Sequence, residues 1–384
     1  MQDSIFTMPT LPTELIIEIL SRVSVKSLLK FRCVSKSWLA LIRSPQFVKT
    51  HVSVSAKNKD YTHHRLVLTE VRNFFTSHDV QYILKDCSLS SLRNDSVIEP
   101  LDLNYPMKNP QLNVCVVGSV NGLICLDIEE NDLVLWNPSL RLYKKLPDSR
   151  LKVSGGSHID RATSVIYGFG YDESSDDYKV VGVLCMERRC TFHHLEVKIY
   201  SLKSNSWRSK DGIPDGVQLI RPCMFLNGKL HLAGELNVGF HKDRNIVSID
   251  LTDEKWGKLE QPLYVEGNFF VKLEVLGSDL SVFCNYIESH ADVWVMREYG
   301  VKESWTKTYT IKYPTYHWSP FISQRLCMSN KGDILLVPGS TLMVHNPEDE
   351  PIRYPKVTKF GFCTAVNIYI ESLVCAPLFG MNKA

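Results

Sequence analysis

The chain has 384 residues, of which 44% are hydrophobic and 22% charged, and its formal net charge is +2. This composition is ordinary for a globular protein with a sizeable core, and the near balance of charge gives no reason to expect nucleic acid or an anionic membrane as a partner. No run of about 18 apolar residues predicts a membrane span, and the N-terminus lacks the basic and apolar regions of a secretory signal.

The eleven cysteines are spread along the chain, mostly inside apolar runs such as those around Cys115 and Cys125. In a chain without an export signal, cysteines in such runs are typically buried and reduced. We therefore expect reduced thiols and a protein of the cytoplasm, the nucleus or both.

The first fifty residues are the only part of the chain with a clear helical pattern. Thr10 is the expected cap of a first helix that has Pro12 in its first turn. Ser24 and Ser35 are expected to cap a second and a third helix, and Pro45 is expected to end the third. Apolar residues recur at helical spacing in all three segments, which gives each helix an apolar face.

The apolar side chains of these helices exceed what about forty residues can bury among themselves. Each buried Leu or Ile contributes roughly 1.5–3 kcal/mol of transfer free energy, so leaving several of them in water is costly. The helices therefore either cap the remainder of the same chain or dock to another protein. Periodicity alone does not choose between these two interpretations.

The same residues resemble an F-box, the module that recruits the Skp-type adaptor of a cullin–RING ubiquitin ligase. The resemblance is carried by Leu11 and Pro12, by residues 25–29 (Val-Lys-Ser-Leu-Leu) and by residues 31–38 (Phe-Arg-Cys-Val-Ser-Lys-Ser-Trp). One departure is Ser24, where the family usually has proline. The resemblance implies that the adaptor interface is formed or supported by Leu11, Pro12, Leu15, Ile16, Ile19, Leu20, Leu28, Leu29, Val34 and Trp38.

Beyond the helices the pattern changes to strands. Residues 1–50 are predicted to be the helical domain, residues 51–62 a polar linker and residues 63–384 a β domain. In the β domain a unit of short apolar strands and polar turns recurs five times. The spacing of about 45–60 residues is that of kelch-like propeller blades.

We therefore predict a mainly β protein whose three N-terminal helices precede a kelch-like β-propeller of about six blades. The strands of residues 65–84 and the C-terminal run 364–374 are expected to pair as a further blade, which would remove exposed sheet edges. A β-sandwich or a seven-bladed ring is the alternative. Aromatic residues that close the units, such as Trp136 and Trp207, are interpreted as wedges between blades rather than as an exposed binding patch.

This β domain resembles the plant F-box-associated, kelch-type domain, a family that includes the S-locus F-box proteins of pollen. The resemblance rests on short motifs distributed along the domain. They are residues 121–123 (Asn-Gly-Leu), 136–139 (Trp-Asn-Pro-Ser), 168–172 (Gly-Phe-Gly-Tyr-Asp), 177–180 (Asp-Tyr-Lys-Val), 197–201 (Val-Lys-Ile-Tyr-Ser) and 369–374 (Tyr-Ile-Glu-Ser-Leu-Val).

No residue pattern favours an enzyme, a cofactor or a metal site. The Cys and His residues within 185–194 lack the spacing of a zinc finger. The Gly-rich loop at 154–157 has no following Lys and helix to bind phosphate. His63 and His64 are interpreted as solvated, and the acidic residues within 172–177 as a solvated hairpin turn rather than as paired catalytic carboxylates.

Together the two resemblances imply a non-catalytic substrate-recognition subunit of an SCF-type E3 ubiquitin ligase. The helices would bind the adaptor and, through it, the cullin and the RING subunit, while the propeller would bind an unidentified target protein. The S-locus resemblance includes a role in self-incompatibility, with a pistil ribonuclease as target. The alternative is a propeller scaffold or small-ligand-binding protein that acts outside a ubiquitin ligase and forms no adaptor complex.

Target binding is expected in the loops at one rim of the propeller, because loops vary with little effect on the scaffold. The candidate segments are the long or polar interruptions between predicted strands. They are residues 148–162, 185–195, 235–244 and 313–319.

Overall fold

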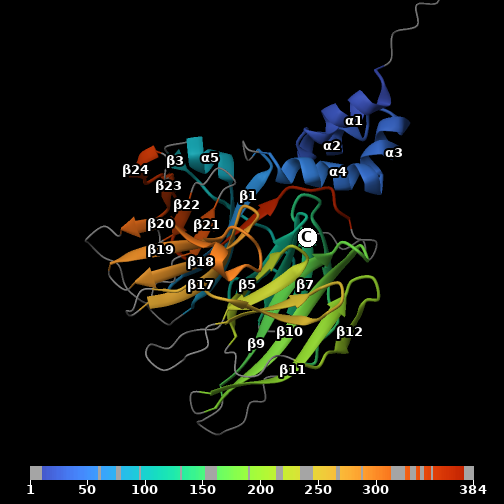
Figure 1. Ribbon diagram of the computed structural model, residues 1–384. Helices are drawn as coiled ribbons and strands as arrows, with labels where there is room; N and C mark the ends of the chain where they lie inside the picture. Colours follow the sequence, from blue (N-terminus) through green and yellow to red (C-terminus); the bar gives the residue numbers. More distant parts are fainter. Residues whose placement is uncertain are drawn as a thin grey trace, which may run out of the picture.

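The structure is a computed structural model of the whole chain, with a helical head above a β-propeller (Figure 1). It describes residues 11–58, 62–74, 79–94, 97–129, 132–151, 162–188, 191–212, 219–233, 245–264, 269–286, 289–312, 325–328, 334–337, 341–346 and 349–375. In these ranges, no helix is both long and apolar enough to cross a membrane.

The head consists of α1 (Thr13–Ser21), α2 (Val25–Phe31), α3 (Lys36–Arg43) and α4 (Pro45–Ala56). The Oγ atoms of Ser24 and Ser35 accept hydrogen bonds, of 3.3 and 3.1 Å, from backbone N–H groups three residues further on. Both predicted caps are therefore confirmed. The first helix starts later than predicted, because its N-cap is Pro12, which has no side chain to accept a bond. Thr10 lies outside the described residues.

Helix α4 was not predicted. Pro45 does follow the end of α3, but it also occupies the first turn of α4, where its missing N–H costs nothing. Ser44 caps this helix by accepting a 3.2 Å hydrogen bond from the N–H of Phe47. Residues 51–56, predicted as part of a linker, therefore belong to a helix, and His51 and Ser55 on it are fully buried.

Five four-stranded antiparallel sheets are each built from strands that are consecutive in the sequence. Their innermost strands are β5 (Val114–Val120), β9 (Ala162–Asp172), β13 (Ile220–Leu226), β17 (Phe269–Leu276) and β21 (Arg325–Met328). The outer strands, sheet by sheet, are β6 (Leu123–Ile128), β7 (Asp132–Asn137), β8 (Leu142–Lys145); β10 (Asp177–Arg188), β11 (Thr191–Ser201), β12 (Ser206–Ser209); β14 (Lys229–Ala233), β15 (Asn245–Asp250), β16 (Trp256–Glu260); β18 (Asp279–Tyr286), β19 (His290–Met296), β20 (Trp305–Lys312); and β22 (Ile334–Val337), β23 (Met343–Asn346), β24 (Asp349–Arg353).

A further sheet joins the two ends of the β domain. Its order is β26 (Phe362–Ile370), β1 (His64–Arg72), β2 (Gln81–Ser88) and β4 (Leu101–Asp102). β26 and β1 are antiparallel, with His64 opposite Ile370, so the predicted pairing of the first strands with the C-terminal run is confirmed. The short strands β3 (Val97–Ile98) and β25 (Lys356–Val357) pair beside this sheet, which also carries helix α5 (Leu89–Asn94), and the 3-10 turn η1 (Lys302–Ser304) precedes β20.

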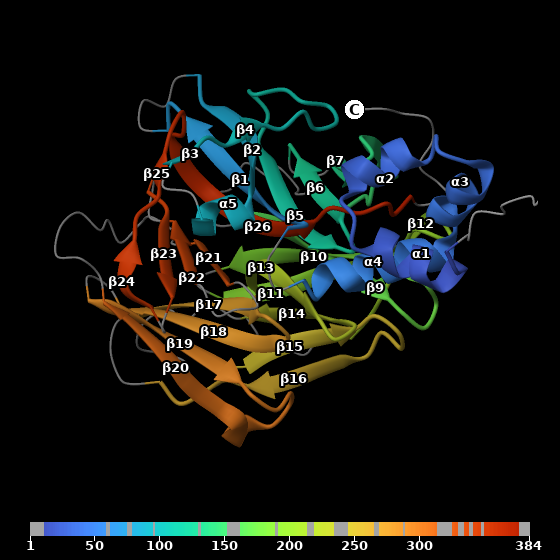
Figure 2. The same cartoon turned by 90° about the horizontal axis from the view of Figure 1, so that it is seen from above.

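The sheets form a closed ring. Each innermost strand contacts the innermost strand of the next sheet, in the order β26, β5, β9, β13, β17, β21 and back to β26. Seen from above, these strands surround the centre and the outer strands radiate from it (Figure 2). The predicted mainly β propeller is confirmed, with five blades of consecutive strands and the closing sheet that joins the chain ends.

A cluster of buried apolar side chains lies between each pair of neighbouring sheets. Trp136 and Tyr200 are almost completely buried in two of these clusters, as expected for wedges between blades. Gly168 and Gly170 allow close approach, because a Cβ on either would lie 2.5 Å from a side-chain atom of the neighbouring sheet. Burial between sheets, rather than within one sheet, therefore stabilises the ring.

Candidate functional site

Three large apolar side chains form an exposed stripe along α1 and the residues before it. Leu11, Leu15 and Ile19 are 58%, 45% and 54% exposed, and their four-residue spacing places them on one face of the helix. Val34, between α2 and α3, is 61% exposed. Exposed apolar side chains gathered in so small a domain are typical of a protein-binding surface. We refer to Leu11, Leu15 and Ile19 as the apolar stripe.

The structure separates the ten predicted adaptor residues into three groups. Leu20 and Leu28 are buried in the core of the head, beside Phe47. Ile16, Leu29 and Trp38 are half-buried against that core. The exposed group is Leu11, Pro12, Leu15, Ile19 and Val34. Leu20 and Leu28 are inaccessible to a partner unless the head rearranges, whereas the exposed group is the most accessible of the three.

Apolar residues of the propeller pack against the core of the head. Leu373, which follows β26, belongs to the core of the head, and Leu140 from the β7–β8 turn packs against it. Asn137 is fully buried, and its Nδ2 donates hydrogen bonds to the carbonyl oxygens of Ser372, at 3.2 Å, and Val374, at 2.8 Å. Two motifs that lie far apart in the sequence, at 136–139 and 369–374, therefore meet where the head sits on the propeller.

Histidines fill the junction between head and propeller. His51 of α4 lies against His63, with ring centroids 5.7 Å apart, and its Nε2 is 2.9 Å from the carbonyl oxygen of Val23. His63 and His64 are 2% and 6% exposed, so the interpretation that they are solvated is wrong. Burial lowers the pKa of all three, and that of His64 falls to about 4. These three imidazoles are therefore neutral at pH 7.

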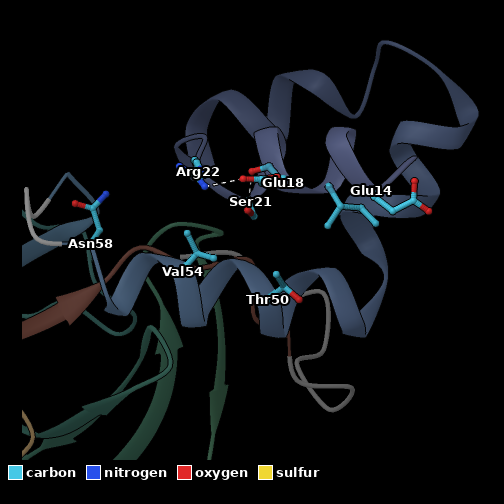
Figure 3. A pocket seen from close by; sticks show the side chains of 8 residues that line it. Glu14, Glu18, Ser21, Arg22, Thr50, Val54 and Asn58 are labelled. Carbon is cyan, nitrogen blue, oxygen red and sulfur yellow. Dashed lines mark hydrogen bonds and ion pairs between the residues drawn. The ribbon is translucent and has the colours of Figure 1, made fainter. Parts of the chain in front are cut away.

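A groove of about 480 Å³ lies between α1 and α4 (Figure 3). Its apolar lining includes Ile17 and Val54, and Glu14 and Glu18 lie at its edge. Arg22 donates a 2.8 Å hydrogen bond to Glu18 there. At 100° per residue, Ile17 lies about 200° around α1 from the apolar stripe, so groove and stripe face different directions.

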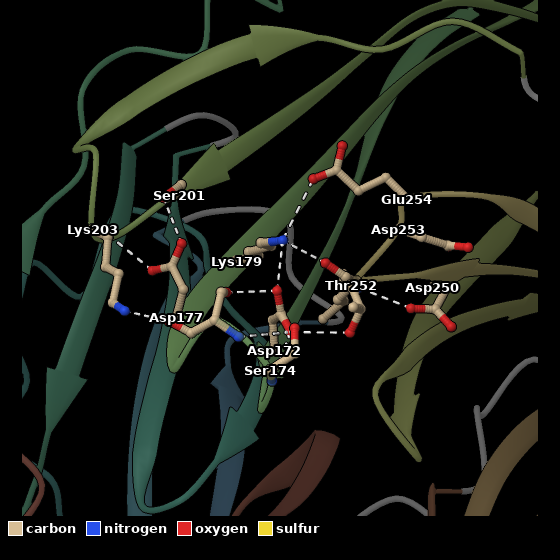
Figure 4. Close-up of polar contacts among 12 residues, drawn as sticks. Asp172, Ser174, Asp177, Lys179, Ser201, Lys203, Asp250, Thr252, Asp253 and Glu254 are labelled. Carbon is tan, nitrogen blue, oxygen red and sulfur yellow. Dashed lines mark hydrogen bonds and ion pairs between the residues drawn. The ribbon is translucent and has the colours of Figure 1, made fainter.

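The acidic residues of the β9–β10 hairpin hold two blades together (Figure 4). Asp172 is buried and bonds Lys179 Nζ at 3.0 Å and the hydroxyl of Thr252, from the neighbouring sheet, at 3.0 Å. Lys179 also lies 3.5 Å from Glu254. Burial alone would raise the pKa of Asp172, but the hydrogen bonds it accepts hold that pKa well below its ordinary value. Asp177 is buried too.

We call Asp172, Asp177, Lys179, Thr252 and Glu254 the interblade cluster. The interpretation of a fully solvated turn is wrong for its two buried carboxylates, although Glu173 and Asp176 are exposed. Each buried carboxylate is tied to serine, lysine or threonine groups of the fold, which suits a structural role rather than proton transfer. Among the described residues, no group of three His, Cys, Asp or Glu side chains is placed to hold a metal ion.

The inner strands β5, β9 and β26 all end beside the head. Lys49 of α4 forms a 3.0 Å ion pair with Asp176 in the β9–β10 turn, and Gly122 in the β5–β6 turn lies against Ser372 after β26. β5, β9 and β26 therefore begin on the opposite side of the ring, which we call the far face. In Figure 1 the β10–β11 hairpin extends away from the head in this direction.

Three of the four candidate target-binding segments are flanked by strand ends on the far face. Residues 148–162 lead into the start of β9. Residues 185–195, predicted as an interruption between strands, are instead mostly strand, because 185–188 belong to β10 and 191–195 to β11, and the two strands pair up to Arg188 and Thr191. Residues 235–244 join β14 to the start of β15, whose other end lies in the interblade cluster near the head. Residues 235–244 and 313–319 lie outside the described residues, as do residues 152–161 and 189–190 of the other two segments.

A cavity of about 550 Å³ occupies the axis of the ring and is lined by its inner strands. Phe74, 48% exposed, stacks on Phe362 at the start of β26, with ring centroids 4.8 Å apart, which places this part of the lining at the far face. Lys272 and Glu274 form an ion pair on its wall, and Asp127 also lines it. The volume is within the range of about 300–1,000 Å³ that is typical of ligand pockets.

Comparison with known proteins decides what kind of chain carries these surfaces. The model of the F-box domain matches residues 8–50, and that of the F-box associated beta propeller domain matches residues 71–374. The chain belongs to the F-box proteins with an F-box-associated propeller. The resemblances read from the sequence are thereby confirmed. An F-box implies binding of a Skp-type adaptor, and the propeller serves for substrate, so the general role is substrate recognition in an SCF ubiquitin ligase.

Several F-box proteins of Arabidopsis thaliana are similar over most of the chain. F-box/kelch-repeat protein At3g23880 is 32% identical over 377 residues, which cover 96% of each chain. F-box protein CPR1 is 33% identical over 80% of this chain and 74% of its own. F-box protein At4g22390 is 30% identical over 85% of this chain and 80% of its own.

Proposed function

We propose that this F-box protein joins a Skp-type adaptor, and through it a cullin and a RING subunit, to a target protein held on the far face. The exposed apolar stripe carries the proposal, because it leaves Leu15 and Ile19 in water at the end of the molecule away from the far face. Bound in this way, the receptor contributes proximity rather than chemistry to ubiquitin transfer. We place this activity in the cytoplasm, the nucleus or both.

The adaptor arm of the proposal is tested with Leu15→Asp plus Ile19→Asp. Both side chains are already exposed, so the variant is expected to keep the thermal stability of the wild type. Two charges in the apolar centre of an interface are expected to weaken adaptor binding at least about 100-fold, as measured by surface plasmon resonance. Leu29, half-buried in the head, is unsuitable for this test because its substitution would also disturb the core.

The matched control is Leu263→Asp, because Leu263 is 83% exposed on the propeller. It is expected to bind the adaptor like the wild type. Unchanged binding of the stripe variant would place the adaptor elsewhere. A wild-type chain that does not bind any Skp-type adaptor would instead favour the alternative, a propeller that acts outside a ubiquitin ligase.

The target arm is tested at the mouth of the axial cavity. Phe74→Asp places a charge among the aromatic side chains of the far face, at a position that is half exposed. Proteins that accumulate on the wild-type receptor when the proteasome is inhibited are expected to be lost from the variant, while the adaptor is retained. Equal recovery would exclude the cavity mouth. A pistil ribonuclease among those proteins would support the self-incompatibility role.

A further inference from the structure

The axial cavity is lined by small side chains and by apolar side chains that are only partly buried. Gly118, Ser119 and Ala365 belong to the innermost strands β5 and β26, and their small size leaves the axis open. Met224 and Phe225 of β13 line the same cavity and are half-buried, although their strand is the innermost of its sheet. The cavity therefore presents apolar surface to a ligand, and covering this surface would favour binding through the hydrophobic effect.

Two charged side chains interrupt the apolar wall. Lys272 and Glu274 lie two residues apart on β17, which places them on the same face of the strand, and both line the cavity. They form an ion pair, and their side chains are only 19% and 9% exposed. A buried ion pair adds little stability over well-packed apolar side chains of similar size, so packing alone gives no reason for charges at this position. An apolar wall with a few polar groups is typical of ligand pockets.

A third polar group lies on the wall formed by the closing sheet. Thr69 of β1 lines the cavity and is 3% exposed, and its Oγ1 has no hydrogen-bond partner among the residues that the structure describes. Buried polar groups in proteins are nearly always hydrogen-bonded. A ligand with a polar atom on this side of the cavity would supply a partner for the hydroxyl.

We propose that the axial cavity binds a free α-amino acid with a large apolar side chain. The inference goes beyond the proposed function, since it concerns neither the adaptor nor the target protein. The ligand's carboxylate meets Lys272 and its ammonium group meets Glu274, because the two side chains are adjacent and so are the two charges of an α-amino acid. An ammonium group has three protons and a carboxylate two acceptor oxygens, so both can bind a ligand as well as each other.

A ligand with one charge, or with none, fits this wall less well. An anion that pairs with Lys272 lies beside the carboxylate of Glu274, and a cation that pairs with Glu274 lies beside the ammonium group of Lys272. Like charges repel strongly where the surroundings are apolar. An uncharged apolar molecule would displace water from both groups without replacing its hydrogen bonds, which is costly. Only a ligand with adjacent opposite charges matches the pair.

The test is isothermal titration calorimetry of the full chain with three probes of the same apolar body. They are phenylalanine, phenethylamine, which lacks the carboxylate, and hydrocinnamate, which lacks the ammonium group. Phenylalanine is expected to bind with a Kd below about 1 mM, as suits a ligand of this size. Each singly charged probe is expected to bind at least about 10-fold more weakly, because it loses one charged hydrogen-bonding group.

Variants of the ion pair separate ligand recognition from packing. Lys272→Met plus Glu274→Gln removes both charges and is expected to weaken phenylalanine binding at least about 10-fold. Lys272→Glu plus Glu274→Lys keeps an ion pair in the wall and is expected to retain most of the affinity, because the ligand can bind in the reverse orientation. Glu274→Gln alone is expected to make hydrocinnamate the tightest of the three probes, a change that a merely structural ion pair would not produce.

The control is Asp132→Asn plus Lys145→Met, which removes a 2.8 Å ion pair between β7 and β8, outside the cavity. It is expected to bind phenylalanine like the wild type. Equal affinity of the wild type for all three probes, or no binding of phenylalanine at millimolar concentration, would overturn the inference. Unchanged binding by the variant without both charges would do the same. That variant is expected to keep its adaptor binding, so failure of this inference and failure of the proposed function are distinguishable.

Discussion

Neighbouring residues in the head have opposite roles. Ile19 is 54% exposed and available to a partner, whereas Leu20 is 2% exposed and holds α1 against the core. Their side chains differ by a 100° rotation around the same helix axis, and this rotation alone separates a docking residue from a folding residue. Substitution of either residue would reduce adaptor binding, but only substitution of Leu20 would do so by unfolding the head.

The histidines at the junction predict how stability depends on pH. An unfolded chain binds a proton on His64 near its ordinary pKa of 6.5, whereas the folded protein does so only near 4. Between these pH values the unfolded state binds more protons, so the free energy of unfolding is highest above pH 6.5 and falls as the pH drops towards 4. We expect Tm to decrease over this range.

The variant His64→Gln tests this origin of the pH dependence. It removes the titrating group while keeping a polar side chain of similar length. The decrease in Tm between pH 7 and pH 5, measured by differential scanning calorimetry, is expected to be about 2–4 °C smaller than in the wild type. An identical decrease in both proteins would show that His64 does not contribute, and Tm at pH 8 serves as the reference for any loss unrelated to protonation.

At the level of elements, two turns with the same local sequence have different surroundings. Asn121-Gly122 joins β5 to β6 and Asn227-Gly228 joins β13 to β14, and all four residues have positive φ. A Cβ on Gly228 would meet nothing within 4 Å, whereas a Cβ on Gly122 would meet Ser372 Oγ and, at 2.5 Å, the carbonyl oxygen of Ile370. The turn at Asn227-Gly228 therefore only connects two strands, whereas the turn at Asn121-Gly122 also supports the head.

Gly228→Ala and Gly122→Ala therefore form a matched pair. Gly228→Ala is expected to cost about 1 kcal/mol of unfolding free energy, because only the left-handed backbone is strained. Gly122→Ala is expected to cost about 2 kcal/mol more, because the segment after β26 must also shift. Urea denaturation measures both values. Equal losses would mean that the contact of Gly122 with Ser372 is easily relaxed.

For the whole molecule, closure of the ring depends on the last strand. β26 pairs with β1 and is the inner neighbour of both β5 and β21, so it joins the two ends of the propeller. Truncation after residue 361 removes this strand and exposes the edge of β1. We expect that protein to aggregate, or to lose a single cooperative unfolding transition, in size-exclusion chromatography and calorimetry.

The control truncation stops after Cys375. It keeps β26, Leu373 in the core of the head and the hydrogen bonds between Asn137 and Val374. This shorter chain is expected to have the Tm of the full chain and to bind the adaptor. A cooperative, monomeric protein that lacks β26 would show that the remaining sheets are stable without ring closure.

The sequence was sufficient for the features that depend on local interactions. Ser24 and Ser35 were recognisable as helix caps because a cap bonds an N–H group only three residues away. The repeated strand unit indicated a propeller because each blade repeats the same alternation of strands and turns. The motifs at both ends of the chain identified the family, which the matches to residues 8–50 and 71–374 confirm.

Only the tertiary structure decided which polar and apolar groups are buried. His63, His64 and Asp172 looked solvated because their partners lie in α4 or in another blade, far away in the sequence. The start of α4 at Pro45 was missed because a proline after a helix is equally compatible with a stop and with a new start. Whether a residue of the head faces its core or a partner depends on how α1 rotates against α4, and that is set by long-range packing rather than by any local pattern.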